Sequence, residues 1–397
     1  MAAAPDSHAH APHVFLVAGE ESGDRLGAAL IAALRAHTQG HVHISGIGGT
    51  HMAEAGVPSP FPLGDLAIVG FSSIPGKLPK ILKRIREAAD AVIAARPDVL
   101  VIIDSPDFTH RVAKRVRKAL PSLPIVDYVC PSVWAWRPWR ARSMKAYVDH
   151  VLTLLPFEPA ELKRLGGPPG TYVGHPLIER VDELRPNAEE ARRRLTDPPI
   201  LLVMPGSRGA EIRRMAAVFG AAVGKVANRV GALEVVVPAV PRLADTVRAA
   251  LRSWPVPTRI VTDADEKLAA FRMARAALTK SGTSTLELAL AGIPMVAAYK
   301  VSLIEAGVGQ LMIRVPSVIL ANLVLGEAAV PEFLQFDCTP VRLAAALAPL
   351  LSDTPERQRQ VAALARLDEV MDIDGEAPSA RAAAVVLDVV TGVRRPP

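Results

Sequence analysis

Short runs of apolar residues alternate with longer amphipathic segments along most of the chain. His13–Ala18 and Val99–Ile103 are almost wholly apolar, which is typical of parallel strands that are buried on both faces. Segments such as Arg25–Ala36 and Arg111–Leu120 place apolar residues three or four positions apart, as amphipathic helices do. This alternation predicts an α/β fold with parallel sheets.

The strand-like runs form two series. The first series comprises His13–Ala18, Val42–Ile47, Val99–Ile103, Pro124–Tyr128 and Val151–Leu155. The second comprises Ile200–Met204, Leu233–Pro238, Thr258–Val261, Ala276–Thr279 and Met295–Ala298. Two successive series of strand and helix predict two doubly wound, Rossmann-like domains.

The domain boundary is expected near a stretch rich in glycine and proline. Residues 166–170 read GGPPG and are followed by GHPLIE, which together form a candidate junction. We therefore assign residues 1–174 to the first domain and 175–369 to the second. Residues from about 370 to 397 are predicted to be helical and to pack back on the first domain.

Composition limits the cellular setting. The 397 residues include only two cysteines, Cys130 and Cys338, which excludes a disulfide framework and suits a reducing cytoplasm. The N-terminus lacks the basic and apolar regions of a signal peptide. No run approaches the roughly 18 uncharged apolar residues of a spanning helix. We expect a soluble cytoplasmic protein or a peripheral membrane protein.

Charge is unevenly distributed along the chain. The net charge is +6, but the segment from Lys77 to Lys145 holds 15 Lys/Arg and 6 Asp/Glu, an excess of +9 that leaves −3 for the remainder. Such a basic region favours an anionic partner, which could be nucleic acid, anionic lipid or a phosphorylated substrate. A solvated basic face is the alternative. No nucleic-acid recognition motif accompanies the region, so we expect no nucleic-acid partner.

The first apolar run is followed by the sequence GEESGD at residues 19–24. Ligands of doubly wound sheets bind at the carboxyl ends of strands, and a glycine-rich turn lets backbone N–H groups approach them. Glu20, Ser22, Gly23 and Asp24 are therefore candidate substrate-binding residues. The turn does not match the GxGxxG dinucleotide fingerprint. As an alternative, Ser22 or Asp24 could simply cap the next helix.

An acidic residue follows the central run of the first domain. Asp104 comes directly after Val99–Ile103, where a partly desolvated carboxylate suits a general base. The alternative is a structural hydrogen-bond acceptor. Asp107, three residues further on, is better explained as a helix cap.

Two loops of the second domain resemble phosphate-binding turns. Gly206, Ser207 and Arg208 follow Ile200–Met204 and precede a helix, so backbone N–H groups and a guanidinium could bind a phosphate. The Lys-[Ser/Thr] pair of a P-loop is missing, which disfavours ATP hydrolysis.

The second of these loops is the sequence KSGTSTLE at residues 280–287. Ser281, Gly282 and Thr283 are suited to a diphosphate at the start of a helix, and Glu287 could accept hydrogen bonds from both ribose hydroxyls. Two such loops in the second domain, with an acid in the first, predict a nucleotide-sugar enzyme.

Metal and cofactor motifs are weak. Asp263-Ala264-Asp265 spells DxD, but its position between a short strand and a helix favours helix capping. His175 has no neighbour at metal-ligand spacing. We expect neither a metal site nor a cofactor.

Two segments of the first domain could contact a membrane. Leu63–Ala95 places apolar residues on one side of a predicted helix and Lys or Arg on the other, which suits an anionic bilayer. The alternative is that its apolar side packs on the core. The segment from Val133 to Arg140 holds three of the four tryptophans, interleaved with arginines, and could contact lipid or sugar or pack at an interface.

These segments together resemble the lipid-A-disaccharide synthase family. The matching stretches lie between residue 17 and about residue 327, and the most specific are CPSVWAWR, PGSRGAEI and SGTSTLELALAGIP. The chain departs from the usual family pattern at positions such as Cys130, Thr109 and Ala321, but these differences do not affect the overall resemblance. The resemblance implies a GT-B fold, in which two Rossmann-like domains face a central cleft. It also implies metal-independent, inverting transfer of 2,3-diacylglucosamine from UDP to 2,3-diacylglucosamine 1-phosphate, forming a β-1,6 linkage.

The resemblance also assigns roles to individual residues. Asp104 matches the base that deprotonates the acceptor 6-hydroxyl, and Arg208 matches the arginine that binds the UDP diphosphate. Ser281, Gly282, Thr283 and Glu287 match the nucleotide-binding segment, and Asn322 matches an asparagine near the donor. The loop with Glu20, Ser22, Gly23 and Asp24 matches one that faces the cleft.

The expected partners follow from this assignment. They are the two glycolipid substrates and the anionic surface of the inner membrane, and a homodimer is a further candidate assembly. The alternatives are a UDP-N-acetylglucosamine epimerase or another lipid-acceptor transferase of the same fold, and a non-catalytic nucleotide-sugar binding module.

Overall fold

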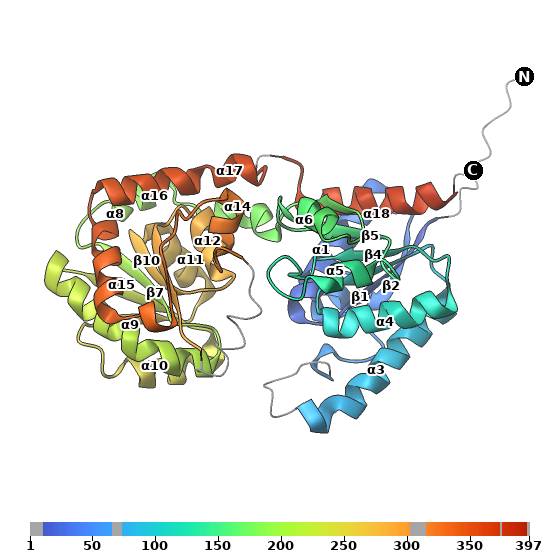
Figure 1. Cartoon of the computed structure of the whole chain (residues 1–397), viewed down its shortest axis with the longest axis horizontal. Coiled ribbons are helices and arrows are strands. Elements are labelled where there is room, and N and C mark those ends of the chain that lie inside the picture. Colours follow the sequence, from blue (N-terminus) through green and yellow to red (C-terminus); the bar gives the residue numbers. More distant parts are fainter. Residues whose placement is uncertain (1–10, 66–73, 302–314, 374, 395–397) are drawn as a thin grey trace, which may run out of the picture. The chain divides into compact units, whose positions relative to one another are not determined.

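The computed structural model describes residues 11–65, 74–301, 315–373 and 375–394 (Figure 1). The chain forms two compact units, and each has its own parallel sheet. Unit 1 comprises Met1–Pro176 and Glu376–Pro397, and unit 2 comprises Leu177–Gly375.

Unit 1 is built on a six-stranded parallel sheet with the order β2-β1-β3-β4-β5-β6. Its strands are β1 (His13–Ala18), β2 (His43–Ile47), β3 (Val99–Ile103), β4 (Ile125–Tyr128), β5 (His150–Thr153) and β6 (Gly170–Tyr172). Its helices are α1 (Glu21–His37), α2 (Thr50–Glu54), α3 (Ile74–Ala95), α4 (Pro106–Ala119), α5 (Trp139–Met144), α6 (Glu158–Arg164) and α18 (Pro378–Arg394).

Helices cover both faces of this sheet, as the fully apolar β3 requires. Every residue of β3 is buried. One core cluster joins the sheet to α1 and α18, with Leu30 of α1 and Val386 of α18 among its members. The other joins the sheet to α3 and α4, with Ile85 and Val112 among its members. The C-terminal helix α18 thus belongs to the core of unit 1 (Figure 1).

Unit 2 has a second six-stranded parallel sheet with the order β12-β11-β10-β7-β8-β9. Its strands are β7 (Ile200–Met204), β8 (Glu234–Pro238), β9 (Thr258–Val261), β10 (Ala276–Lys280), β11 (Met295–Tyr299) and β12 (Glu332–Leu334). Its helices are α7 (Val181–Leu184), α8 (Ala188–Arg194), α9 (Gly209–Val230), α10 (Ala244–Leu251), α11 (Ala264–Met273), α12 (Ser284–Leu290), α14 (Leu320–Leu325), α15 (Pro340–Leu347), α16 (Pro355–Ala365) and α17 (Leu367–Val370).

All ten strands predicted from the apolar runs are present, with ends that differ by at most two residues. The three-residue edge strands β6 and β12 were not predicted. Each is an edge strand of its sheet, and every residue of both is only partly buried. Because such strands do not need to be wholly apolar, neither forms an apolar run in the sequence. The predicted junction combined GGPPG at residues 166–170 with the GHPLIE stretch that comes after it. GGPPG leads into β6 within unit 1, and the boundary between the units falls after Pro176, inside GHPLIE and two residues from the predicted boundary.

Candidate functional site

Both sheets have a topological switch point at which the chain departs in opposite directions. In unit 1 it lies between β1 and β3, and in unit 2 between β7 and β10. In doubly wound sheets, ligands bind beside the carboxyl ends of the two strands at this point. The loops that carry the predicted site residues Glu20–Asp24, Asp104, Gly206–Arg208 and Ser281–Thr283 follow these four strands.

Asp104 follows β3 in a strained turn. Asp104 and Ser105 both have positive φ angles, of 53° and 46°, a left-handed conformation that is uncommon outside glycine. The hydroxyl of Thr109 on α4 stabilises the turn by donating to the carbonyl of Asp104 at 2.6 Å. The backbone N–H of Ser105 and the hydroxyl of Ser22 donate to Oδ1 and Oδ2 of Asp104, at 2.7 and 2.6 Å. The Asp104 carboxylate is thus oriented and still half-buried at the surface of the site.

The glycines of the first loop allow it to approach this turn closely. A Cβ on Gly23 would lie 2.9 Å from the carbonyl oxygen of Ile103, and one on Gly19 would lie 2.6 Å from Cβ of Ser105. Both positions therefore require glycine because of packing within unit 1. This contact brings the first turn of α1 against the turn that bears Asp104.

The side chain of Asp24 stabilises a neighbouring loop. Its buried carboxylate accepts hydrogen bonds from the backbone N–H groups of Gly49, His51 and Met52, at 2.6 to 3.1 Å. These three hydrogen bonds all lie within unit 1. The predicted capping of α1 by Ser22 or Asp24 is wrong, because the N-cap residue is the exposed Glu20 and α1 has no side-chain cap.

A buried polar network lies behind the turn of Asp104 and was not found from the sequence. Nε2 of His110 on α4 lies 3.0 Å from Oδ2 of Asp127 on β4, and its Nδ1 lies 3.1 Å from the hydroxyl of Tyr147. Burial raises the pKa of Asp127, while the nearby His110 opposes this shift. Burial also raises the pKa of Tyr147 to about 12. The network anchors α4, the helix that Asp104 precedes.

Unit 2 contains a pocket of about 280 Å³ at its switch point. Among the predicted residues, those that line it are Gly206, Ser207, Arg208, Gly282, Thr283 and Glu287. Gly206 has a φ of 135°, and a Cβ there would lie 2.6 Å from Cβ of Glu211. The pocket is therefore formed by two glycine-bearing turns, each of which precedes a helix.

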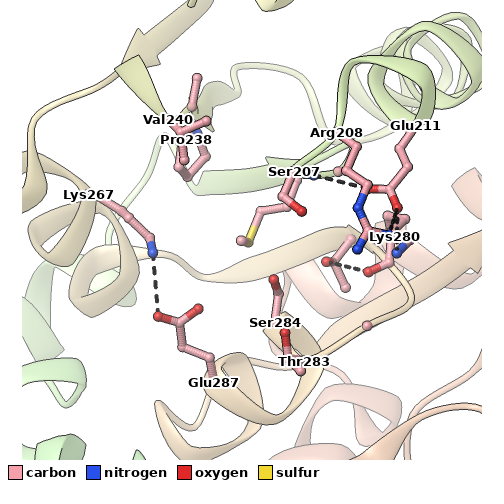
Figure 2. Close-up of a pocket in the computed structure, with 15 residues that line it drawn as sticks. Ser207, Arg208, Glu211, Pro238, Val240, Lys267, Lys280, Thr283, Ser284 and Glu287 are labelled. Carbon is pink, nitrogen blue, oxygen red and sulfur yellow. Dashed lines mark hydrogen bonds and ion pairs between the residues drawn. The ribbon is translucent and has the colours of Figure 1, made fainter. Parts of the chain in front are cut away.

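Two charged groups lie on opposite sides of this pocket (Figure 2). On one side, the buried Glu211 lies 3.2 Å from Nζ of Lys280 and 3.6 Å from Nη1 of Arg208. On the other side, Nζ of Lys267 lies 3.5 Å from Glu287. The sequence reading missed Lys267, Lys280 and Glu211 as members of the site, because only tertiary structure brings α11, β10 and α9 together. Three cations against two carboxylates suit an anionic ligand.

Ser281 and Asn322 do not line the pocket. Ser281 is buried, and its hydroxyl donates to the carbonyl of Val318 at 3.4 Å. The buried Asn322 amide bonds the backbone of Val330 in both directions and donates to the hydroxyl of Ser317. The Ser281 side chain thus stabilises the segment before α14. Asn322 stabilises that segment and also the connection between α14 and β12.

The DxD sequence caps a helix, as predicted. Oδ1 of Asp263 accepts from the backbone N–H groups of Asp265 and Glu266 at the start of α11, at 2.9 and 3.0 Å. Across the described ranges there is no group of three or more His, Cys, Asp or Glu side chains placed to hold a metal ion. Nor does any helix in those ranges have the length and apolar character needed to cross a membrane.

The tryptophan and arginine segment follows β4 in unit 1. Trp134 is partly buried and donates its indole N–H to Glu158 at 3.0 Å, whereas Trp136 and Trp139 are 40% and 63% exposed. Burial raises the pKa of Glu158 to about 7, although backbone N–H groups and the Trp134 indole oppose the shift. Trp134 therefore packs, and Trp136 and Trp139 present aromatic surface to solvent.

The amphipathic helix of the proposed membrane segment is α3. Residues 66–73 lie outside the described residues, and side chains can be described only from residue 79 onward. From there, the apolar side of the helix packs into the core through Ile81, Ile85 and Ala89. Leu82 is exposed, and the neighbouring Lys83 side chain is 71% exposed. For this part of the helix, the alternative of core packing is correct.

Comparison with known proteins gives a consistent family. The sequence model described as lipid-A-disaccharide synthetase matches residues 14–385. Curated lipid-A-disaccharide synthases of Nitrobacter hamburgensis and Bradyrhizobium diazoefficiens are each 58% identical to this chain, over 96% of it and 97% of their own length.

Solved structures with the same fold are more distant in sequence. MurG of Acinetobacter baumannii has a TM-score of 0.55 at 16% identity, covering 96% of this chain and 99% of that one. The UDP-GlcNAc 2-epimerase of Methanocaldococcus jannaschii, solved with UDP-GlcNAc and UDP, has a TM-score of 0.57 at 12% identity, covering 94% and 99%. These matches identify the predicted two-domain GT-B fold.

Proposed function

Because the chain belongs to the lipid-A-disaccharide synthase family of glycosyltransferases, we propose that it transfers 2,3-diacylglucosamine from UDP to 2,3-diacylglucosamine 1-phosphate. The products are UDP and the β-1,6-linked disaccharide 1-phosphate, formed with inversion. Besides family membership, the pocket of unit 2 carries this proposal, because its turns and cations suit a nucleoside diphosphate.

The donor binds in the pocket of unit 2. Arg208 and Lys280 exchange their contacts with Glu211 for the diphosphate, and the N–H groups at the start of α9 contribute further donors. Glu287 turns from Lys267 to the ribose hydroxyls. These groups stabilise the charge that develops on UDP as the bond from the anomeric carbon to the phosphate oxygen breaks.

Asp104 acts as the general base. One of its carboxylate oxygens takes the proton of the acceptor 6-hydroxyl as that oxygen forms its bond to the anomeric carbon. Ser22, Ser105 and the constrained turn support this role because they fix the direction of the carboxylate. The exposed Glu20 is proposed to face the substrate from the same loop, whereas Gly23 and Asp24 shape the loop.

We place the reaction at the cytoplasmic face of an anionic inner membrane. The supporting observations are the exposed Trp136 and Trp139 and the exposed Lys83 and Leu82 on α3. The apolar side of α3 does not support it, because its described part is buried. A homodimer remains a prediction that light scattering of the purified protein would test.

The function is tested by incubating the protein with UDP-2,3-diacylglucosamine and 2,3-diacylglucosamine 1-phosphate and detecting the disaccharide by mass spectrometry. We expect product with the wild-type protein and very little with Asp104→Asn. A folded protein that bound UDP without forming product would instead indicate the binding-module alternative. Epimerisation of UDP-N-acetylglucosamine would indicate the epimerase alternative, which the family match does not favour.

A further inference from the structure

Two arginines of unit 1 gather around a single exposed indole. The guanidinium carbon of Arg137 lies 4.2 Å from the ring centroid of Trp136, and that of Arg140 lies 5.8 Å from the same centroid. Both distances are within the range of cation–π contacts. Two positively charged guanidiniums thus lie beside the partly exposed indole of Trp136.

Few negative charges balance this pair. Arg140 forms an ion pair at 3.3 Å with Asp107, whose side chain is 79% exposed. Within the described part of the chain, no carboxylate forms an ion pair with Arg137. Because only Arg140 has a carboxylate partner, the two guanidiniums together leave a net positive charge, which an anionic ligand would neutralise.

The backbone is strained at the same place. Arg137 has a φ of 54°, in the left-handed region that non-glycine residues seldom adopt. Such strain persists where the surrounding structure enforces it, and it is concentrated at functional sites. The strained residue lies between Trp136 and α5, and both Arg137 and Arg140 reach the same indole.

These arginines lie beyond the carboxyl end of β4, a neighbour of the strand that leads to Asp104. Their segment follows β4, which pairs in parallel with β3, the strand that leads to Asp104. The contact partner of Arg140 is Asp107, in the first turn of α4 and three residues after Asp104. A ligand on the arginines is therefore close to the proposed base within the same unit.

We propose that Arg137 and Arg140 bind the 1-phosphate of the acceptor, and that Trp136 and Trp139 contact its apolar part. This assignment rests on the proposed function, which supplies an acceptor with a phosphate monoester. Guanidiniums match phosphate oxygens with paired N–H donors, so two of them can recognise a dianionic monoester. The site would make the enzyme select acceptors that carry a phosphate.

The test compares acceptors with and without the 1-phosphate in neutral detergent micelles, which contain no anionic lipid. We expect Arg137→Ala and Arg140→Ala each to lower kcat/KM for the phosphorylated acceptor about 10- to 100-fold. The phosphate-free analogue, used as a substrate or as an inhibitor, should be affected less than threefold. UDP affinity measured by calorimetry should not change, because the donor pocket lies in unit 2.

Arg142→Ala is the matched control, since Arg142 is an exposed arginine on the same helix that contacts neither Trp136 nor Asp107. Equal losses for both acceptors would overturn the proposal and indicate a general surface role. So would normal kinetics in micelles combined with weaker binding to anionic vesicles, which would assign the arginines to phospholipid headgroups. Absence of product with the wild-type protein would instead defeat the proposed function, and it is recognised before any variant is compared.

Discussion

The hydroxyl of Ser22 donates a 2.6 Å hydrogen bond to Oδ2 of Asp104, across 82 residues of sequence. Ser22 lies in the first turn of α1 and Asp104 lies beyond the end of β3. The bond joins the two loops that diverge at the switch point of unit 1. It therefore directs the carboxylate that we propose as the base.

Ser22→Ala should lower kcat about 10- to 100-fold with little change in donor KM. A hydrogen bond to a charged group is worth about 1.5–3 kcal/mol, and this bond orients the group that reacts. Ser22→Thr retains the hydroxyl and should restore most of the rate. Ser59→Ala, which also removes a hydroxyl but elsewhere in unit 1, serves as the control. A threonine variant as slow as the alanine variant would contradict the orienting role.

Asp104→Asn should reduce kcat by two to four orders of magnitude, about the contribution of a general base. Asparagine tolerates the left-handed conformation of this residue, so the fold should be preserved better than in Asp104→Ala. The measurement is single-turnover kinetics, with UDP affinity from calorimetry as a check on folding of unit 2. Turnover within tenfold of wild type would remove Asp104 from the mechanism.

Arg208→Ala and Lys280→Ala should each weaken UDP binding about 10- to 100-fold, because each removes a cation from the donor pocket. The loss should shrink as salt concentration rises, since part of the attraction is screened. Calorimetric titration with UDP measures the effect. Arg229→Ala, at the other end of α9, is the control and should bind UDP normally. Unchanged affinity in the Lys280 variant would restrict the diphosphate site to Arg208.

Asp24→Ala should destabilise unit 1 by about 3 kcal/mol, because three backbone N–H groups would lose a charged acceptor. Chemical denaturation followed by tryptophan fluorescence gives the free energy of unfolding. Residual folded protein should retain UDP affinity, since the pocket lies in unit 2. If stability were normal and only substrate affinity fell, Asp24 would be a ligand residue after all.

Glu158 should make the stability of unit 1 depend on pH. Burial raises its pKa from 4.5 to about 7, so the folded chain binds a proton more readily than the unfolded chain. The stability of the wild type relative to Glu158→Gln should therefore fall as pH rises from about 4.5 to about 7, by up to about 3 kcal/mol. Above pH 7 the difference should be constant. Parallel denaturation series for the two proteins give this difference, and a constant value across the whole range would contradict the raised pKa.

Ten of the strands and the glycine-bearing turns could be predicted from the sequence alone. These features depend on short-range rules: β3 reads as a buried strand because all five of its residues are apolar, and Asp263 caps α11 through N–H groups two and three residues away. The resemblance to a family rested on the same local motifs.

The hydrogen-bond and ion-pair partners of the polar side chains depend on the tertiary structure. Asp24 and Asn322 were predicted as ligand residues from the sequence, and only the fold shows that their side chains hydrogen-bond to the backbone of other loops. Lys280 and Glu211 line the pocket of unit 2 only because β10 pairs with β7, the strand that precedes α9.

The same holds for the surfaces of unit 1. The apolar residues of α3 would show the same helical spacing whether they faced a bilayer or a protein core. Only the packing of Ile85 against the sheet shows that they face the core. The local sequence pattern indicates which residues form a helix or a strand. Hydrogen bonds and ion pairs, however, need atoms within a few ångströms of each other, and only the fold brings residues distant in sequence so close together.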